Sequence, residues 1–179
     1  MLKQAQEKSS LLSLSIPWIE GDCRHLQLAR RFALIIMAGN AFQAMLTKED
    51  QNQLLSSVKQ HLLPGGLFVF DTRNPNLIEL TAPSVEENWH TYKNRFGDEI
   101  QVSGYHAYDP LSQIATYTTI RKSEKTTRNT HIQLRYTFPQ ELDSLLANHG
   151  FKIIARYGAY NKQDFEGTQS SMINVCCLS

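Results

Sequence analysis

Polar and small residues follow three predicted strands at the point where each strand ends. In an open α/β sheet, ligands bind at the carboxyl ends of the parallel strands. An aspartate there can accept a hydrogen bond from an exocyclic amine, and an asparagine on a tight turn can present its amide to a zwitterion. The three sets are Gly21, Asp22 and Cys23; Ala38, Gly39 and Asn40, with Phe42 just beyond; and Asp71, Thr72, Arg73 and Asn74. This pattern predicts a small-molecule site at one edge of the sheet.

Purely structural roles are the alternative for the same residues. Asp22 can cap the segment that follows it, and Asn40 can serve only to tolerate a turn, because Asn and Asp are common turn formers. Arginine is a residue type found mostly at the surface, so Arg73 has the same alternative. A strand histidine such as His106 is more often packed or solvent-facing than catalytic.

The elements that position these residues alternate between strand and helix in the first half of the chain. Apolar runs predict strands at 16–21, 32–38 and 67–71, and the second run reads as a strand buried on both faces. Thr47 is a good N-cap for a helix that ends before Pro64. Strand, helix and strand at this spacing form a βαβ unit, so we expect the sheet to be parallel here.

Residues 89–137 have a different character and predict an antiparallel insert. Strand-like runs are separated by turn signals such as Gly97-Asp98 and Asp109-Pro110. The last run alternates cleanly, which places Ile132, Leu134, Tyr136 and Phe138 on one face. We therefore expect a sheet that is packed on one face and solvated on the other.

The C-terminal part again combines helix and strand, as the first half of the chain does. Thr137 and Gln140 have the spacing of a capping box at the start of a helix, and Gly150 is a typical C-terminal stop. Strands are predicted at 151–159 and 172–178. The α/β pattern therefore resumes after the insert, and we interpret residues 1–179 as a single domain.

Composition excludes several classes of protein. The chain has 179 residues, of which 41% are hydrophobic and 20% charged, as in an ordinary soluble globular protein. The net charge of +1 argues against nucleic-acid binding, and no apolar run is long enough for a membrane span. Cys23, Cys176 and Cys177 lack metal-ligand spacing, and we interpret them as reduced thiols of a cytoplasmic protein without a metal site.

Several segments together resemble class I S-adenosylmethionine-dependent methyltransferases. These are IEGDCRHL, FALIIMAGNAFQAML, KQHLLPGGLFVFDTRNPN and FPQELDSLLANHGFKII, and they cover nearly the whole chain. The helix, PGG turn and strand ending in Asp are fairly specific to that family. The insert is similar to that of small-molecule enzymes of the glycine and sarcosine N-methyltransferase kind. The resemblance implies S-adenosylmethionine as cofactor and a direct in-line transfer of methyl to a small-molecule acceptor.

The resemblance also implies roles for individual positions. It places the cofactor against Met1, Leu2, Asp22, Cys23, Ala38, Gly39, Asn40 and Phe42. Asp22 would meet the adenine amine, and Phe42 would lie near the mouth where the methyl is transferred. An acceptor would face Arg73, Asn74, Tyr105 and His106. No residue is identified as a catalytic acid or base.

The opening MLKQA matches an internal M-L-x-x-A motif of the family, and no G-x-G-x-G occurs in the 179 residues. We therefore expect a Rossmann-like methyltransferase sheet that lacks its first two strands. The family's glycine-rich loop cradles the methionine part of the cofactor, so we expect weak or absent cofactor binding and impaired activity. Strands 16–21 and 32–38 would be left as apolar edges, which predicts either direct pairing of the two strands or a homo-oligomer.

Two other functions stay open. A non-catalytic interaction module that keeps the methyltransferase fold is favoured by the unusual start of the chain. Another nucleotide-binding α/β protein, such as a dehydrogenase, is disfavoured by the absent G-x-G-x-x-G and by the insert.

Overall fold

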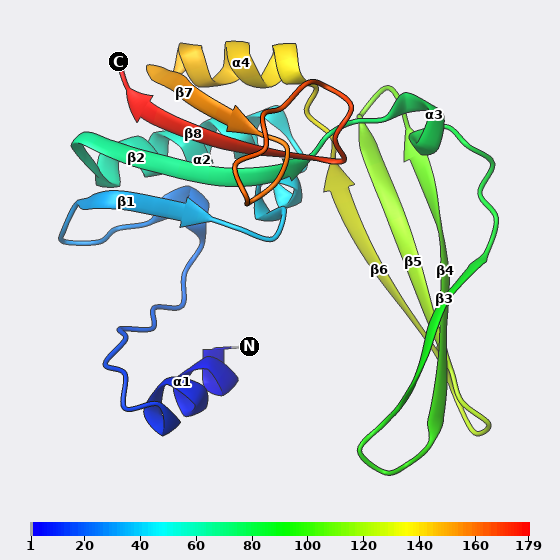
Figure 1. Cartoon of the computed structure of the whole chain (residues 1–179). Helices are drawn as coiled ribbons and strands as arrows, with labels where there is room; N and C mark the ends of the chain where they lie inside the picture. Colours follow the sequence, from blue (N-terminus) through cyan, green and yellow to red (C-terminus); the bar gives the residue numbers. More distant parts are fainter. Residues whose placement is uncertain (1) are drawn as a thin grey trace.

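The computed structural model describes residues 2–179, which form two four-stranded sheets (Figure 1). The main sheet has the order β1-β2-β8-β7, and the insert sheet has the order β3-β4-β5-β6. The elements are α1 (Leu2–Leu11), η1 (Cys23–His25), β1 (Phe32–Met37), η2 (Ala41–Ala44), α2 (Lys48–His61), β2 (Leu62–Arg73), α3 (Leu77–Leu80), β3 (Glu87–Lys93), β4 (Glu99–Asp109), β5 (Ile114–Lys122), β6 (Thr127–Arg135), α4 (Pro139–Asn148), β7 (Phe151–Tyr157) and β8 (Ser171–Leu178).

The predicted βαβ unit is confirmed. β1 and β2 pair in parallel, and α2 connects them. Thr47 begins α2 with a capping box, because its side chain accepts from the Asp50 N–H while the Asp50 carboxylate accepts from the Thr47 N–H. The C-terminal strands β7 and β8 also form, and β8 pairs antiparallel with both β2 and β7.

One face of the main sheet carries the core. Phe68 and Phe70 of β2 pack there against leucines of α2 and α4, including Leu54 and Leu142, all of them nearly or fully buried. The rings of Phe68 and Phe70 stack with centroids 4.8 Å apart. Both helices therefore cover the same face of the sheet.

The prediction that residues 32–38 form a strand buried on both faces is wrong in its second part. β1 is an edge strand of the main sheet, and its Leu34 and Ile36 are 50% and 62% exposed. The helices that bury the core lie on the other face, so these two side chains have no covering layer among residues 2–179. β1 therefore presents the apolar edge that the sequence predicts for strand 32–38.

The predicted strand at 16–21 is not formed. The direct pairing of 16–21 with 32–38, which was one of the two alternatives for the exposed edges, therefore does not occur. The chain runs there as an extended segment between α1 and η1. Ile16 and Ile19 are 44% and 58% exposed, and the Trp18 indole N–H donates to Ser9 Oγ of α1 at 3.1 Å. In Figure 1, α1 and this segment lie away from the main sheet. Without a neighbouring strand, this exposed run gains no inter-strand hydrogen bonds that would favour a β-strand.

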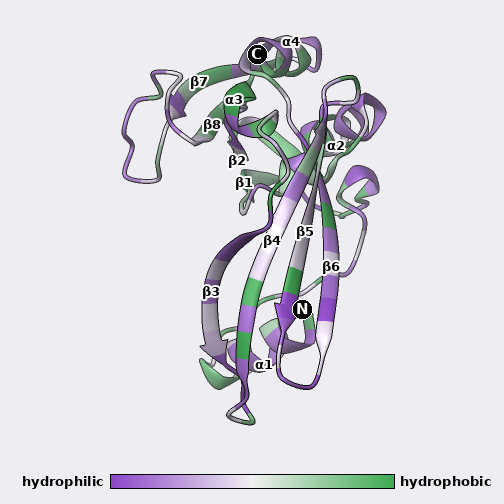
Figure 2. Ribbon diagram, turned by 90° about the vertical axis from the view of Figure 1, so that its right-hand side faces the viewer, coloured by the Kyte–Doolittle hydropathy of each residue, from purple (hydrophilic) through white to green (hydrophobic). Residues whose placement is uncertain are grey.

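The antiparallel insert is confirmed over β3 to β6, which pair in sequence order. Figure 2 shows hydrophobic and hydrophilic residues alternating along β4 and β5. At Gly104 a side chain would meet the Trp89 ring at 2.4 Å, so the glycine lets that indole lie against the strand. The inner face is less covered than expected, since Ile132 is 54% exposed.

Arg135 anchors the insert to the main sheet. Arg135 is 3% exposed, and its side chain makes four hydrogen bonds of 2.6–3.1 Å. It donates to Gln51 on α2, to Glu141 on α4, and to Gln113 and Thr137, which lie outside helices and strands. The predicted capping box of α4 is wrong, because Phe138 is the N-cap and has no side-chain cap bond. Thr137 instead accepts from Gln51 at 2.8 Å inside this buried network.

The three cysteines are free, as expected from their spacing. Burial raises the pKa of Cys176 to about 12, so this thiol stays protonated at neutral pH. Among residues 2–179, no helix has the length and apolar character needed for a membrane span.

Candidate functional site

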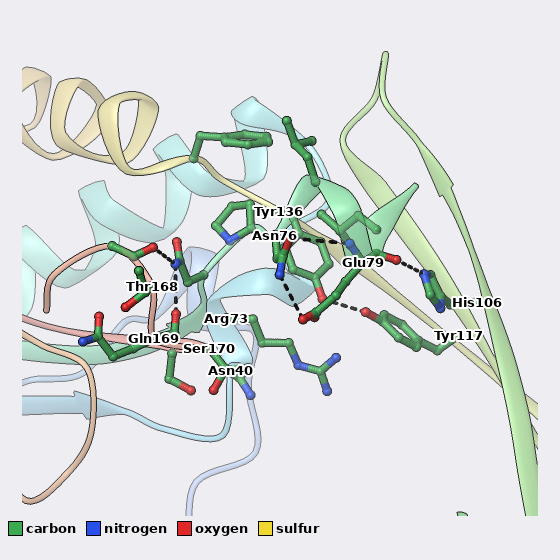
Figure 3. Close-up of a pocket in the computed structure, with 17 residues that line it drawn as sticks. Asn40, Arg73, Asn76, Glu79, His106, Tyr117, Tyr136, Thr168, Gln169 and Ser170 are labelled. Carbon is green, nitrogen blue, oxygen red and sulfur yellow. Dashed lines mark hydrogen bonds between the residues drawn. The ribbon is translucent and has the colours of Figure 1, made fainter. Parts of the chain in front are cut away.

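A cavity of about 840 Å³ opens between the carboxyl end of β2 and the insert sheet (Figure 3). Its walls come from the end of β1, the segment 73–80, strands β4 and β5, residues 136–138 and the β7–β8 loop. The lining residues are Asn40, Arg73, Asn74, Pro75, Asn76, Leu77, Glu79, Leu80, His106, Tyr117, Tyr136, Phe138, Gly167, Thr168, Gln169, Ser170 and Ser171. The sheet edge predicted to bind a ligand therefore borders the cavity.

Arg73 is the fixed positive charge of this cavity. It is the last residue of β2, and its backbone N–H donates to the buried Gln43 side chain at 3.1 Å. Its guanidinium carbon lies 5.1 Å from the centroid of the Tyr117 ring, and no ion pair among residues 2–179 involves it. A half-buried guanidinium with free donors is suited to a carboxylate or another anion.

Two tyrosines flank Arg73. The Tyr117 and Tyr136 hydroxyls are hydrogen-bonded to each other at 2.6 Å, which leaves one hydroxyl hydrogen of the pair free for a ligand. Burial lowers the pKa of Arg73, but interactions with the hydroxyls of Tyr136 and Tyr117 raise it by more. The pKa is therefore above its usual value. Burial and the bond to Tyr136 also raise the pKa of Tyr117. At neutral pH the group therefore consists of a cation and neutral donors.

The turn at the end of β1 is held by Asp71. This buried carboxylate accepts from the Gly39 N–H at 3.2 Å, from the Asn40 N–H at 2.9 Å and from the Tyr160 hydroxyl at 2.9 Å. Gly39 and Asn40 both have positive φ, at 77° and 58°. Asp71 therefore stabilises a strained turn that presents Asn40 to the cavity.

Asn40 has a buried side-chain oxygen without a hydrogen-bond partner among residues 2–179. A buried, unpaired carbonyl oxygen costs free energy unless a ligand supplies a donor. Space beside Gly39 is open, since no atom of residues 2–179 lies within 4 Å of where its Cβ would be. The two residues therefore fit the ammonium group of an amino acid, such as the methionine end of S-adenosylmethionine.

The residues predicted for the adenine end fit less well. Arg24 holds Asp22 through a bidentate ion pair and also pairs with Asp50. Hydrogen bonds from Arg24 lower the pKa of Asp22 to about 2. Asp22 also caps η1, which is the structural role weighed for it from the sequence. Cys23 is half-buried and packs against the core.

Two further cofactor predictions disagree with the structure, and a third lies outside it. Phe42 is fully buried in the core, 4.9 Å from the Phe70 ring, so it does not line the mouth of the cavity. Leu2 lies on α1, away from the end of β1 (Figure 1). Met1 lies outside the described residues. Ala38 is an exposed residue directly before the Gly39 turn.

The four residues predicted to face an acceptor separate into three groups. Arg73 and His106 both line the cavity. Asn74 lines it too, but its side chain donates to the Gly167 and Gln169 carbonyls at 2.8 and 2.9 Å and so holds the β7–β8 loop. Tyr105 is next to His106 on β4, so it points to the opposite face of the insert sheet and does not line the cavity.

Sequence reasoning missed Tyr117, Tyr136 and Glu79. Register explains the first two, because Tyr117 pairs with His106 across β4 and β5, and Tyr136 follows β6 on the face that the alternation predicted. Glu79 is the carboxylate of the lining and accepts from the Asn76 amide at 2.9 Å. No sequence signal indicated that the β7–β8 loop closes one wall.

Neither a protein-family profile nor a curated protein sequence matches the chain. Solved structures do. An S-adenosylmethionine-dependent methyltransferase from Clostridium acetobutylicum superposes with a TM-score of 0.83 at 15% identity, over 99% of this chain and 71% of that one. The CcbJ methyltransferase from Streptomyces caelestis gives a TM-score of 0.83 at 23% identity, over 99% and 70%. DesVI from Streptomyces venezuelae gives 0.69 at 14% identity, over 98% and 70%. The chain therefore has the fold of the S-adenosylmethionine-dependent methyltransferases.

Proposed function

We propose that the protein is an S-adenosylmethionine-dependent methyltransferase acting on a small molecule that carries an anionic group. The carrying observation is the half-buried guanidinium of Arg73, which forms no ion pair among residues 2–179, in a large cavity at the same sheet edge as the Asn40 turn. The fold of the solved methyltransferases supports the reaction class. S-adenosylmethionine, when bound, supplies an electrophilic methyl group.

The chain's own residues would bind and orient the acceptor. Arg73 and the free hydroxyl hydrogen of the Tyr117–Tyr136 pair would hold its anionic group. An amine acceptor releases a proton on methylation, and the Glu79 carboxylate in the same cavity would receive it. Most of the rate enhancement would come from positioning, because in-line transfer of methyl needs no covalent intermediate on the enzyme.

We expect the cofactor to bind weakly to this chain. The ion pair with Arg24 engages Asp22, and the 179 residues contain no G-x-G-x-G. Each lost hydrogen bond to a charged group costs roughly 1.5–3 kcal/mol, which is at least about tenfold in affinity. Isothermal titration of the purified chain with S-adenosylhomocysteine should give a dissociation constant weaker than micromolar. Micromolar or tighter binding would contradict this expectation.

Methyl transfer tests the proposed function itself. The chain is incubated with methyl-labelled S-adenosylmethionine and a panel of small amines, each with and without a carboxylate. Transfer to carboxylate-bearing amines supports the proposal. Absence of transfer at saturating cofactor favours the non-catalytic interaction module, for which the engaged Asp22 is the supporting observation.

We also propose that the protein forms a homo-oligomer through the edge and open face of β1. Leu34 and Ile36 are 50% and 62% exposed there, and an apolar edge strand is prone to pairing with another chain. Ile36→Lys is expected to shift the protein from dimer or larger assembly to monomer in multi-angle light scattering. Ile132→Lys, on the insert sheet at 54% exposure, is the matched control. A wild-type monomer across a dilution series would refute the proposal.

A further inference from the structure

The wall of the cavity next to Arg73 is made of conjugated rings. Figure 3 shows Tyr117 between the Arg73 guanidinium and the His106 imidazole. The Tyr117 and His106 rings stack with centroids 5.4 Å apart and an interplanar angle of 27°. The charge that holds an anionic group is therefore continued by a row of unsaturated rings.

Local structure holds His106 in place. It lies directly opposite Tyr117 in the β4–β5 register, and its Nε2 is 3.2 Å from the Glu79 carbonyl oxygen of α3. Tyr117 is fixed by its hydroxyl bond to Tyr136. A ligand ring stacking here would meet side chains that already have their orientation, which limits the entropy lost on binding.

The cavity is large, and it also has to admit the methionine end of the cofactor at Asn40. Its volume of about 840 Å³ lies in the upper part of the range of roughly 300–1,000 Å³ that suits drug-sized ligands. Apolar side chains add to the ring wall, among them Leu77, Leu80 and Phe138. A short acid held by Arg73 would leave these surfaces in contact with water, whereas a larger ring-bearing acid would cover them.

We propose that the acceptor is a carboxylate bearing an aromatic ring, with the carboxylate on Arg73 and the ring against the Tyr117–His106 wall. This rests on the proposed function and names its substrate class. Planar rings prefer offset or tilted stacking on such side chains, and Arg73 presents a fork that matches a carboxylate. His106 is thus a specificity-determining residue that selects for the ring.

Binding of defined acids to the full chain tests the proposal. The probes are acetate and 3-phenylpropionate, titrated by NMR or calorimetry, with 3-phenylpropanamide as the neutral analogue of the aromatic acid. Wild-type protein is expected to bind 3-phenylpropionate about tenfold tighter than acetate, which is the gain expected for burying a phenyl group. His106→Ala should reduce this preference to less than about threefold without changing acetate binding.

Two further variants separate recognition of the ring from an effect on folding. His106→Phe keeps a ring but loses the contact with Glu79, so it should retain the preference if stacking is the cause. His90→Ala removes a histidine whose ring is tilted against that of a tyrosine, Tyr92, with centroids 6.1 Å apart. His90 does not line the cavity, so this variant should behave as wild type.

The outcomes also distinguish this inference from the proposed function. Equal affinity for acetate and 3-phenylpropionate overturns the aromatic class while leaving the anion site in place. Loss of the preference in His106→Phe, or an undiminished preference in His106→Ala, overturns the role of His106, because stacking on its ring would then not be the cause. Equal binding of 3-phenylpropionate and its amide overturns the carboxylate end and with it the proposed role of Arg73.

Discussion

Arg73→Gln is expected to weaken binding of 3-phenylpropionate by roughly 10- to 100-fold, because it removes a charged hydrogen-bonding partner worth about 1.5–3 kcal/mol. Glutamine keeps a polar side chain in the cavity but loses the positive charge and the planar fork. The affinity of the neutral amide should not change. If methyl transfer to a carboxylate-bearing amine is measurable, kcat/KM should fall by the same factor. Parallel titrations of acid and amide with wild type and variant provide the measurement.

A second substitution separates charge from geometry at this position. Arg73→Lys keeps the charge but replaces the planar fork with a point charge, so the loss should be smaller than for glutamine. Arg95→Gln is the matched control, since Arg95 also lies over an aromatic ring, Phe96 at 4.7 Å, but outside the cavity. Undiminished binding in Arg73→Gln would refute the role of Arg73 in holding an anion.

Local patterns were sufficient for most of the elements. The start of helix α2 could be placed from Thr47, because a capping box is made by residues three apart. Gly150 could be predicted as a helix stop because glycine adopts positive φ readily, and its φ is +76°. The alternation of the last insert strand held only in part, since Ile132 is exposed whereas Arg135 and Thr137, expected on the solvated face, are buried. These features depend on neighbours in sequence, which is why a single sequence contains them.

Features that depend on distant parts of the chain were predicted less well. The run at 16–21 has strand-like residues but no partner strand in the described structure, and propensity alone does not make a strand. Thr137 has the right spacing for a capping box, yet the buried Arg135 network engages its hydroxyl. In each case tertiary contacts, or their absence, overrode the local signal.

The site shows the same division. Asn40 and Arg73 were identifiable because residues after parallel strands share one edge of the sheet. Tyr117 and Tyr136 were not, because they belong to an insert whose position over that edge is set by packing. The Arg24 partner of Asp22 is only two residues away, but its side chain also reaches Asp50 on α2, a contact that sequence spacing did not indicate.

Arg135→Ala is expected to destabilise the protein by roughly 3–5 kcal/mol, the cost typical of removing one partner from a buried charge pair. Arg135 is 3% exposed, and its Nη2 lies 2.6 Å from Glu141 Oε1. The substitution would leave Gln51 and Gln113 without a donor, and Glu141 would keep only the exposed Lys48 ammonium, 3.7 Å away. Chemical denaturation followed by circular dichroism measures the change in free energy of unfolding.

The same substitution should also loosen the cavity, because the side-chain network of Arg135 fixes the position of its backbone, which alanine keeps and which contacts the site. Its carbonyl oxygen accepts from the Gln43 side chain at 3.4 Å, and the Gln43 oxygen in turn accepts from the Arg73 N–H. Arg121→Ala is the control, since Arg121 is half-buried and its side chain donates to Thr130 within the insert sheet, at 3.1 Å. A cost for Arg135→Ala no larger than for Arg121→Ala would show that the buried network does not hold the two sheets together. A large cost with unchanged binding of 3-phenylpropionate would show that the network stabilises the fold without positioning Arg73.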